Sequence, residues 1–280
     1  IGQPDIETPK SCLDAVKHAD FKVLEYSHSA GNESYRKKLV SYYAKNNIDV
    51  SHNDIIITTG GSEAIMFGFM ACLDAGDEVI IPSPYWVSYR EMVKLGEGKI
   101  VTISSSVEND FKITADQLKA AITPSTRIFC FSSPCNPTGS VYTKDELKAL
   151  ADVLAPHENI IVISDEIYEY INFNNRHESI AQFDNMKDRV VVVNGCSKGY
   201  SMTGWRVGYI GAPLWIAKAC DKMQGQFTSA PCSITQRAGE AALLGGQEPT
   251  YEMVKEFKKR RDIVYNLLKE IPGLKVNLPD

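Results

Sequence analysis

The stretch "VVVVNGCSKGYSMTGWRVGYIGAP" (residues 190–213) decides the fold class. Its four valines predict a buried strand, and the run "RVGYIG" (206–211) predicts a second one. Only the loop that holds Lys198 separates the two runs, whereas two neighbouring parallel strands need a crossover of about a dozen residues. We therefore expect one of these two strands to be antiparallel in an otherwise parallel sheet.

The rest of the chain alternates short apolar runs with helical patterns. Strands are predicted at 55–59, 78–82, 99–103, 127–132, 159–164, 189–194 and 206–211. Helices are predicted at 34–46, 62–74, 85–95, 114–122, 143–154, 231–244 and 249–269. Continuous apolar runs are typical of strands that are covered on both faces. This order predicts an α/β fold with a mostly parallel, seven-stranded sheet and helices on both faces.

The composition excludes several classes of function. The 280 residues are 44% hydrophobic and 23% charged with a net charge of −5, and no basic block predicts binding to nucleic acid or to a membrane. The chain shows no signal peptide and no apolar run of the ~18–20 residues that a membrane-spanning helix needs. Its seven cysteines form no CxxC pair. We expect reduced thiols in a cytoplasmic protein, and we assign no metal ligands.

Ligands of such sheets bind beyond the carboxyl ends of the strands. One loop there, "TTGGSEA", turns directly into a helix. The backbone N–H groups of Gly61, Ser62 and Glu63 could bind an anion at the helix N-terminus, and Arg206 and Ser197 could bind the same anion. The alternatives are an ordinary turn with Ser62 as N-cap and a surface ion pair for Arg206.

The loops after four other strands carry an amine, an acid, aromatic groups and an amide. Lys198 follows a buried strand, where desolvation would free its amine for attack on a carbonyl, although a snorkelling lysine is the alternative. Asp165 needs a cationic partner or several donors, unless it caps the turn "EIYEY", in which Tyr168 could lie beside it. Trp86 offers a stacking face or fills the core, and the Asn136–Pro137 bond is a candidate for a cis peptide or a tight turn.

Together these groups fit one small phosphorylated ring. Pyridoxal 5′-phosphate requires a lysine for a Schiff base, an acid for its pyridinium nitrogen and an anion site for its phosphate. We therefore expect Lys198 to carry this cofactor, Asp165 to pair with its ring nitrogen and Arg206 to hold its phosphate.

The sequence also resembles the class I pyridoxal-phosphate-dependent aminotransferases of fold type I, in the aspartate aminotransferase group. The resemblance rests on the segments "SKGYSMTGWRVGY", "NPTG", "SDEIYE", "GGSEA" and "SPYWVSY", which occur in the family's order, and on "GQPDIETP" and "YSHSAGNESYRKKL". It covers essentially all of the chain.

The resemblance implies a role for each matched residue. Lys198 would form the Schiff base and carry the proton of the substrate's α-carbon, while Asp165 would pair with the ring nitrogen. Tyr168 and Asn136 would bind the ring hydroxyl, Trp86 would stack on the ring, and Gly2, Trp86 and Asn136 would seat the substrate. The phosphate ligands would be Gly61, Ser62, Glu63, Ser197 and Arg206, with Tyr26 from the other subunit of a homodimer.

The resemblance also implies a domain organisation. Residues 1–20 would lead into a large cofactor-binding domain at 21–248, and 249–280 would hold a long interdomain helix and the start of a truncated small domain. The family's carboxylate-binding arginine would lie beyond residue 280. We therefore expect this chain to bind the cofactor, but whether it also turns over substrate stays open. Ser62 stands where some dicarboxylate-specific relatives have a lysine, which leaves the amino donor open.

The function that these observations favour is transamination between an L-amino acid and a 2-oxo acid, with 2-oxoglutarate as the expected acceptor. Two alternatives share the scaffold. One is a β-lyase, which would release free ammonia together with pyruvate. The other is a non-catalytic ligand-sensing domain, which would need a DNA-binding segment before residue 1.

Overall fold

The computed structural model describes residues 2–174 and 176–280, so the first residue of the predicted segment 1–20 lies outside it. Its strands are β1 (Ile55–Thr58), β2 (Glu78–Ser83), β3 (Lys99–Ser104), β4 (Thr126–Ser132), β5 (Ile161–Asp165), β6 (Val190–Gly195) and β7 (Gly208–Gly211). They form one sheet in the order β1-β7-β6-β5-β4-β2-β3. Strand β7 pairs antiparallel with both β1 and β6, and the other pairs are parallel. The predicted fold class and the antiparallel strand are confirmed.

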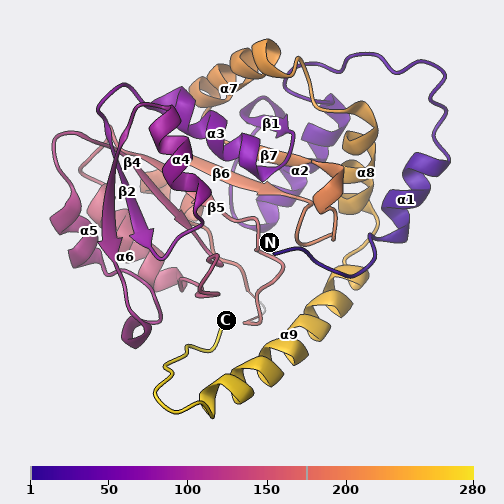
Figure 1. The fold of residues 1–280 in the computed structure, drawn as a ribbon. Coiled ribbons are helices and arrows are strands. Elements are labelled where there is room, and N and C mark those ends of the chain that lie inside the picture. Colours follow the sequence, from indigo (N-terminus) through magenta and orange to yellow (C-terminus); the bar gives the residue numbers. More distant parts are fainter. Residues whose placement is uncertain (1, 175) are drawn as a thin grey trace.

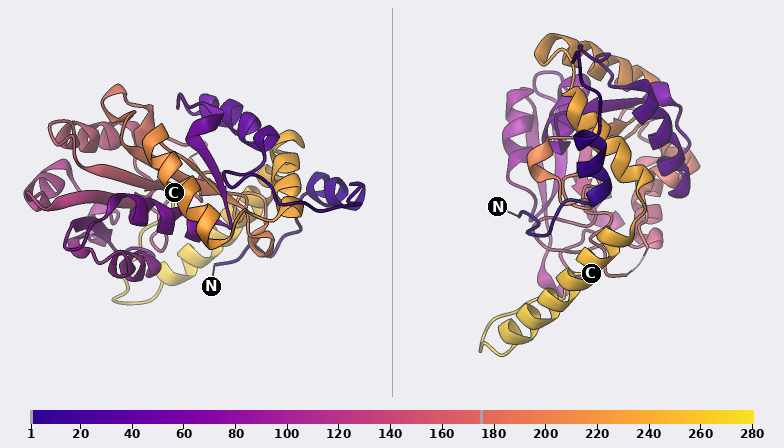
Figure 2. Two further views of the ribbon diagram at one scale, coloured as in Figure 1. Left: turned by 90° about the horizontal axis from the view of Figure 1, so that it is seen from above. Right: turned by 90° about the vertical axis from the view of Figure 1, so that its right-hand side faces the viewer.

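The helices cover both faces of this sheet (Figures 1 and 2). They are α1 (Lys10–Lys17), α2 (Glu33–Lys45), α3 (Gly61–Cys72), α4 (Ser88–Leu95), α5 (Ala115–Ala121), α6 (Lys144–Leu154), α7 (Leu214–Phe227), α8 (Ser233–Leu244) and α9 (Glu248–Lys269). Helices α5 and α6 start at capping boxes, in which Thr114 and Gln117, and Thr143 and Glu146, satisfy each other's backbone N–H groups. Within the described ranges, no helix is long and apolar enough to cross a membrane.

Three helices differ from the prediction. Helices α1 and α7 were not expected, and α4 begins at Ser88 and not at residue 85. Because Pro84 and its neighbours stay outside α4, Tyr85 and Trp86 lie in the loop between β2 and α4. The later start of α4 leaves both aromatic residues at the carboxyl end of the sheet.

The strands divide the core into two layers by their alternation. On one face, Ile161 and Ile163 of β5 pack in a cluster with residues of α3, α4 and α7. On the other face, Val162 packs in a cluster with residues of α2, α5, α6 and α8. Since successive side chains of a strand point to opposite faces, the next two residues of the strand, Ser164 and Asp165, also face opposite layers.

Helix α9 projects from the body of the molecule (Figures 1 and 2). The segment after it folds back, and the backbone N–H of Asp280 donates to the carbonyl of Gly139 at 2.9 Å. The predicted long helix at 249–269 is confirmed, whereas the division into domains stays a prediction.

Candidate active site

A pocket of about 610 Å³ lies at the carboxyl ends of the strands. Most of the predicted site residues line it, namely Gly2, Gly61, Ser62, Trp86, Asn136, Asp165, Tyr168, Ser197, Lys198 and Arg206. Two predicted residues, Glu63 and Tyr26, are not among its lining residues. The fold therefore brings the amine, the buried acid and the anion-binding groups into one cavity.

The anion site forms where β1 turns into α3. Gly60 is the N-cap of α3 with a φ of 87°, and a Cβ atom there would lie 2.6 Å from Nη2 of Arg206. The positive φ therefore favours glycine, and the guanidinium packs close to the Cα atom, where glycine has no side chain. Arg206 also donates from Nη1 to the carbonyl of Thr203 at 2.9 Å, which fixes it beside the helix N-terminus.

Two details of this turn differ from the alternatives considered above. The N-cap is Gly60 and not Ser62, and no side chain caps the helix. The Glu63 carboxylate turns back and accepts from the backbone N–H of Thr59 at 2.5 Å. Ser62 is thereby free to line the pocket.

Lys198 follows β6 and is half-buried. Its Nζ donates to the carbonyl of Gly2 and lies 5.5 Å from the ring centroid of Tyr168. Burial lowers the pKa of Lys198, and the positive charge of Arg206 lowers it further, while Asp165 opposes both. The predicted desolvated lysine is therefore present at the mouth of the pocket.

Asp165 is the last residue of β5 and is only 5% exposed. Its Oδ2 accepts from the hydroxyl of Tyr89 at 2.6 Å, and its Oδ1 accepts from the backbone N–H of Ile167 at 3.2 Å. Burial raises the pKa of Asp165 to about 6, although both donors act to lower it. The second contact resembles the capping role considered above, but the buried carboxylate also lines the pocket.

Tyr89 is a site residue that the sequence did not reveal. It lies on α4, three residues after Trp86, and is fully buried with its hydroxyl on Asp165. The signal was its position on the apolar face of a helix beside an aromatic motif, but a core tyrosine fits that position equally well. Ser132, Ile167 and Thr203 also line the pocket without having been singled out.

The remaining ring-binding candidates form one wall. Asn136 Nδ2 donates to the hydroxyl of Tyr168 at 3.3 Å, and the Asn136–Pro137 peptide bond is cis. Trp86 is half-buried, and its ring packs edge-on against that of Tyr89, with 5.4 Å between the ring centroids. Trp86 therefore reaches the pocket and is not simply a core residue.

Tyr26 lies away from the pocket and is 89% exposed. The alternative that it packs locally against the helix that starts near Ser34 is wrong. Its loop is held by helix α8, whose first residue, Ser233, donates to the carbonyl of Glu25 at 3.1 Å. Val23, on the same loop as Tyr26, and Phe227, the last residue of α7, are also largely exposed.

Comparisons with known proteins agree with this geometry. The family "Aminotransferase class I and II" matches residues 1–280. The chain is 42% identical over 276 residues to the aspartate aminotransferase of Geobacillus stearothermophilus, an alignment that spans 97% of this chain and 70% of that relative. It is 40% identical over 277 residues to the aspartate/prephenate aminotransferase of Nitrosomonas europaea, which spans 98% of this chain and 70% of the relative.

Solved structures show the same fold. The aspartate aminotransferase from Rhizobium meliloti superposes with a TM-score of 0.97 at 38% identity, over 100% of this chain and 71% of that one. The aromatic aminotransferase from Pyrococcus horikoshii superposes with a TM-score of 0.95 at 37% identity, over 100% of this chain and 76% of that one. The chain thus belongs to the class I and II aminotransferase family, in its aspartate aminotransferase group.

Proposed function

We propose that this chain binds pyridoxal 5′-phosphate in the pocket and catalyses transamination between an L-amino acid and a 2-oxo acid, with 2-oxoglutarate as acceptor. The observation that carries the proposal is the convergence of Lys198, Asp165 and Arg206 on one cavity. The donor set fits the cofactor: a cation at a helix N-terminus suits a phosphate, a buried carboxylate suits a pyridinium and a desolvated amine suits an aldehyde.

The bound cofactor would supply an aldehyde that takes up the amino group and a ring that accepts electrons. Arg206 and the N-terminus of α3 would hold its phosphate, with the hydroxyls of Ser62 and Ser197 beside them. Asp165 would hold a proton on the ring nitrogen, because the carboxylate is buried and has no other cation in hydrogen-bonding contact among the described residues. Tyr168 and Asn136, already hydrogen-bonded to each other, would bind the ring hydroxyl.

Lys198 would be both nucleophile and proton carrier. Its lowered pKa increases the neutral fraction of the amine, which is the form that attacks a carbonyl and accepts a proton. Gly2 lies beside both Lys198 and Tyr168 and would, with Trp86 and Asn136, close the pocket over the substrate carboxylate. We further propose a cytoplasmic homodimer in which Tyr26 reaches the partner's site.

The test is Lys198→Ala in the full-length protein, with Lys255→Ala as the control. Lys255 is an exposed lysine on α9 that pairs only with Glu252 in the described structure. We expect Lys198→Ala to lose the visible absorbance of lysine-bound cofactor and nearly all turnover, and Lys255→Ala to keep both. A borohydride-reduced cofactor adduct that maps to another lysine would refute the assignment. A donor screen with 2-oxoglutarate then identifies the amino acid, and release of ammonia with pyruvate would indicate a lyase instead.

A further inference from the structure

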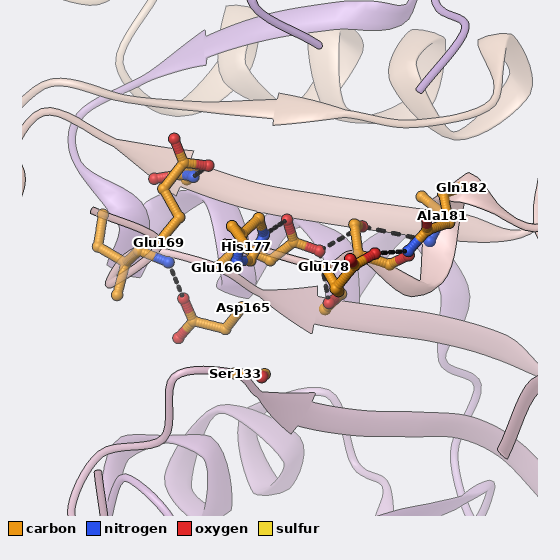
Figure 3. Close-up of polar contacts among 12 residues, drawn as sticks. Ser133, Asp165, Glu166, Glu169, His177, Glu178, Ala181 and Gln182 are labelled. Carbon is orange, nitrogen blue, oxygen red and sulfur yellow. Dashed lines mark hydrogen bonds and ion pairs between the residues drawn. The ribbon is translucent and has the colours of Figure 1, made fainter. Parts of the chain in front are cut away.

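A buried ion pair lies directly behind the active-site acid, on the opposite face of the sheet. Asp165 and Glu166 are consecutive, and both are almost fully buried, with exposed fractions of 5% and 1%. Asp165 lines the pocket, whereas the Glu166 side chain points away from that of Asp165 and accepts a hydrogen bond from Ser164 (Figure 3). Two adjacent buried carboxylates repel each other, so the charge of Glu166 needs a compensating partner.

His177 provides that partner. Its Nε2 lies 2.6 Å from Oε2 of Glu166, and the two side chains are 8% and 2% exposed (Figure 3). Oε1 of Glu166 accepts from the hydroxyls of Ser164 at 2.9 Å and Ser179 at 2.5 Å. Burial acts to lower the pKa of His177, but the charge of Glu166 and its hydrogen bond outweigh it, with help from Glu169, and raise the pKa to about 9. The raised pKa favours the imidazolium form at neutral pH, although the buried Nδ1 of His177 has no hydrogen-bond partner among the described residues.

The same cluster touches a second carboxylate. Glu169 accepts from the hydroxyl of Tyr42 on α2 and from Nδ2 of Asn194 on β6 at 2.9 Å. Ligand atoms of Glu166, Glu169 and His177 lie within 4.8 Å of one another, a spacing that a metal ion could bridge. Both oxygens of Glu166 and Oε2 of Glu169 already have protein partners, however, so we interpret the contacts as those of a hydrogen-bonded ion pair.

We propose that the His177–Glu166 pair is a charge-compensating and positioning element for Asp165, which keeps that carboxylate available to the cofactor's ring nitrogen. The imidazolium cancels the field of Glu166 at Asp165, one residue away. The pair also ties the loop around 176–179 to the end of β5, from which Asp165 and Tyr168 project into the pocket. The proposal rests on the role of Asp165 in the proposed function.

Asp165 and His177 share one charged neighbour, Glu166. The titratable and charged groups that face Asp165 are Glu166, Tyr89 of α4, Cys130 of β4, Tyr168 and Lys198. Those that face His177 are Glu166, Glu169 and Glu178. His177 is the cation of its cluster, so its removal leaves Glu166 without compensation.

The test measures the pKa of Asp165 in the cofactor-free, full-length protein by NMR of ¹³C-labelled aspartate carboxyl groups, with the signal assigned by Asp165→Asn. His177→Gln keeps a hydrogen-bond donor but removes the charge, and we expect it to raise the pKa of Asp165 by about one unit. Glu166→Gln removes the opposite charge, and we expect a shift of similar size downward. The double variant should return close to the wild-type value.

Shifts of opposite sign distinguish charge compensation from a merely structural role, which would move both variants in the same direction. If Glu166→Gln does not fold, a rise in the pKa of Asp165 in His177→Gln still decides, because a merely loosened site would hydrate the carboxylate and lower its pKa. As a second measurement, cofactor affinity is followed while the pH is lowered. Because Asp165 would be protonated at a higher pH in His177→Gln, the affinity should begin to fall at a higher pH in this variant than in the wild type. Unshifted or same-direction pKa values would overturn the proposal even if Lys198 binds the cofactor, whereas opposite shifts without cofactor binding would instead overturn the proposed function.

Discussion

At the scale of single residues, Asp165 lies where burial opposes the ionisation that its proposed role requires. Asp165 must be ionised to hold a proton on a ring nitrogen, but burial raises its pKa to about 6. Tyr89 and the backbone of Ile167 donate to it and offset part of that effect. In the cofactor-free protein, the ionised acid is therefore a source of instability that the bound cofactor would relieve.

Asp165→Asn tests this conflict. A carboxyl group with a raised folded pKa binds its proton more tightly in the folded than in the unfolded state. The destabilisation is thus absent below about pH 4, grows as the pH rises and is fully present above about 6, where it reaches about 3 kcal/mol at most. We expect cofactor-free Asp165→Asn to resist urea better than the wild type at pH 8 but not at pH 4, and turnover with bound cofactor to fall about a hundredfold or more.

The control for this prediction is Asp152→Asn, at an exposed position on α6 that pairs with Lys148. It should change stability little at either pH. Equal stability changes at pH 8 and pH 4 in Asp165→Asn would contradict the burial argument, and near-normal activity with saturating cofactor would remove Asp165 from the mechanism.

At the scale of elements, the anion site depends on how closely β7 approaches the start of α3. A Cβ atom at Gly208 would lie 2.6 Å from the carbonyl carbon of Gly60 and 2.7 Å from the backbone nitrogen of Gly61. These neighbours are backbone atoms, which cannot move aside as a flexible side chain would. The strand therefore sets the position of the helix N-terminus that would bind the phosphate.

Gly208→Ala should displace that turn. We expect a loss of about 1–3 kcal/mol in the free energy of unfolding from overpacking, together with weaker cofactor binding. Gly204→Ala is the matched control, because Gly204 lies in the same segment and a Cβ atom there would meet nothing within 4 Å. Urea unfolding and equilibrium dialysis of the cofactor measure the two effects. Unchanged cofactor affinity in Gly208→Ala would show that the close approach does not position the site.

The element scale also shows where local sequence signals were insufficient. Each predicted strand is present, because buried parallel strands are continuous apolar runs whatever surrounds them. Helix α7 was not predicted, although Ile216 and Cys220 are buried at helical spacing. Its inner face also carries Gln224, whose side chain donates to the carbonyls of Ser29 and Ile57. Because Gln224 interrupts the apolar pattern of the buried face, the sequence of α7 looks less amphipathic than a typical packed helix.

At the scale of the whole molecule, the exposed Tyr26 is the residue on which the proposed homodimer can be tested. Tyr26 has 89% of its surface exposed, and tyrosine is enriched at protein interfaces. In a two-fold dimer, each copy would donate one Tyr26 to the other copy's site. We expect Tyr26→Phe to weaken cofactor binding by about 1.5–3 kcal/mol, through loss of one charge-assisted hydrogen bond, and to leave the dimer intact. Dialysis and analytical ultracentrifugation measure the two effects, with Tyr251→Phe at another exposed position as control.

A mixing experiment separates a contact within one subunit from a contact between subunits. Hybrids of Tyr26→Phe with Lys198→Ala would contain one site with both Lys198 and a donated Tyr26. We expect such hybrids to recover tight cofactor binding at one site in each dimer. If Tyr26 acts within its own subunit, no site in the hybrid has both residues, and mixing would restore nothing.

The sequence alone determined the class of fold and most of the chemistry in the pocket. Apolar runs, glycine turns and the residues that follow each strand are local features of the sequence. Because parallel strands end at the same edge of a sheet, their loops meet there once the strands are assigned. The tertiary structure decided which groups tune that chemistry. Tyr89 meets Asp165 from 76 residues away, and His177 meets Glu166 across a loop. Such contacts depend on how a helix and a loop pack against the sheet, and no local pattern distinguishes a tyrosine or histidine that packs in this way from one that simply fills the core.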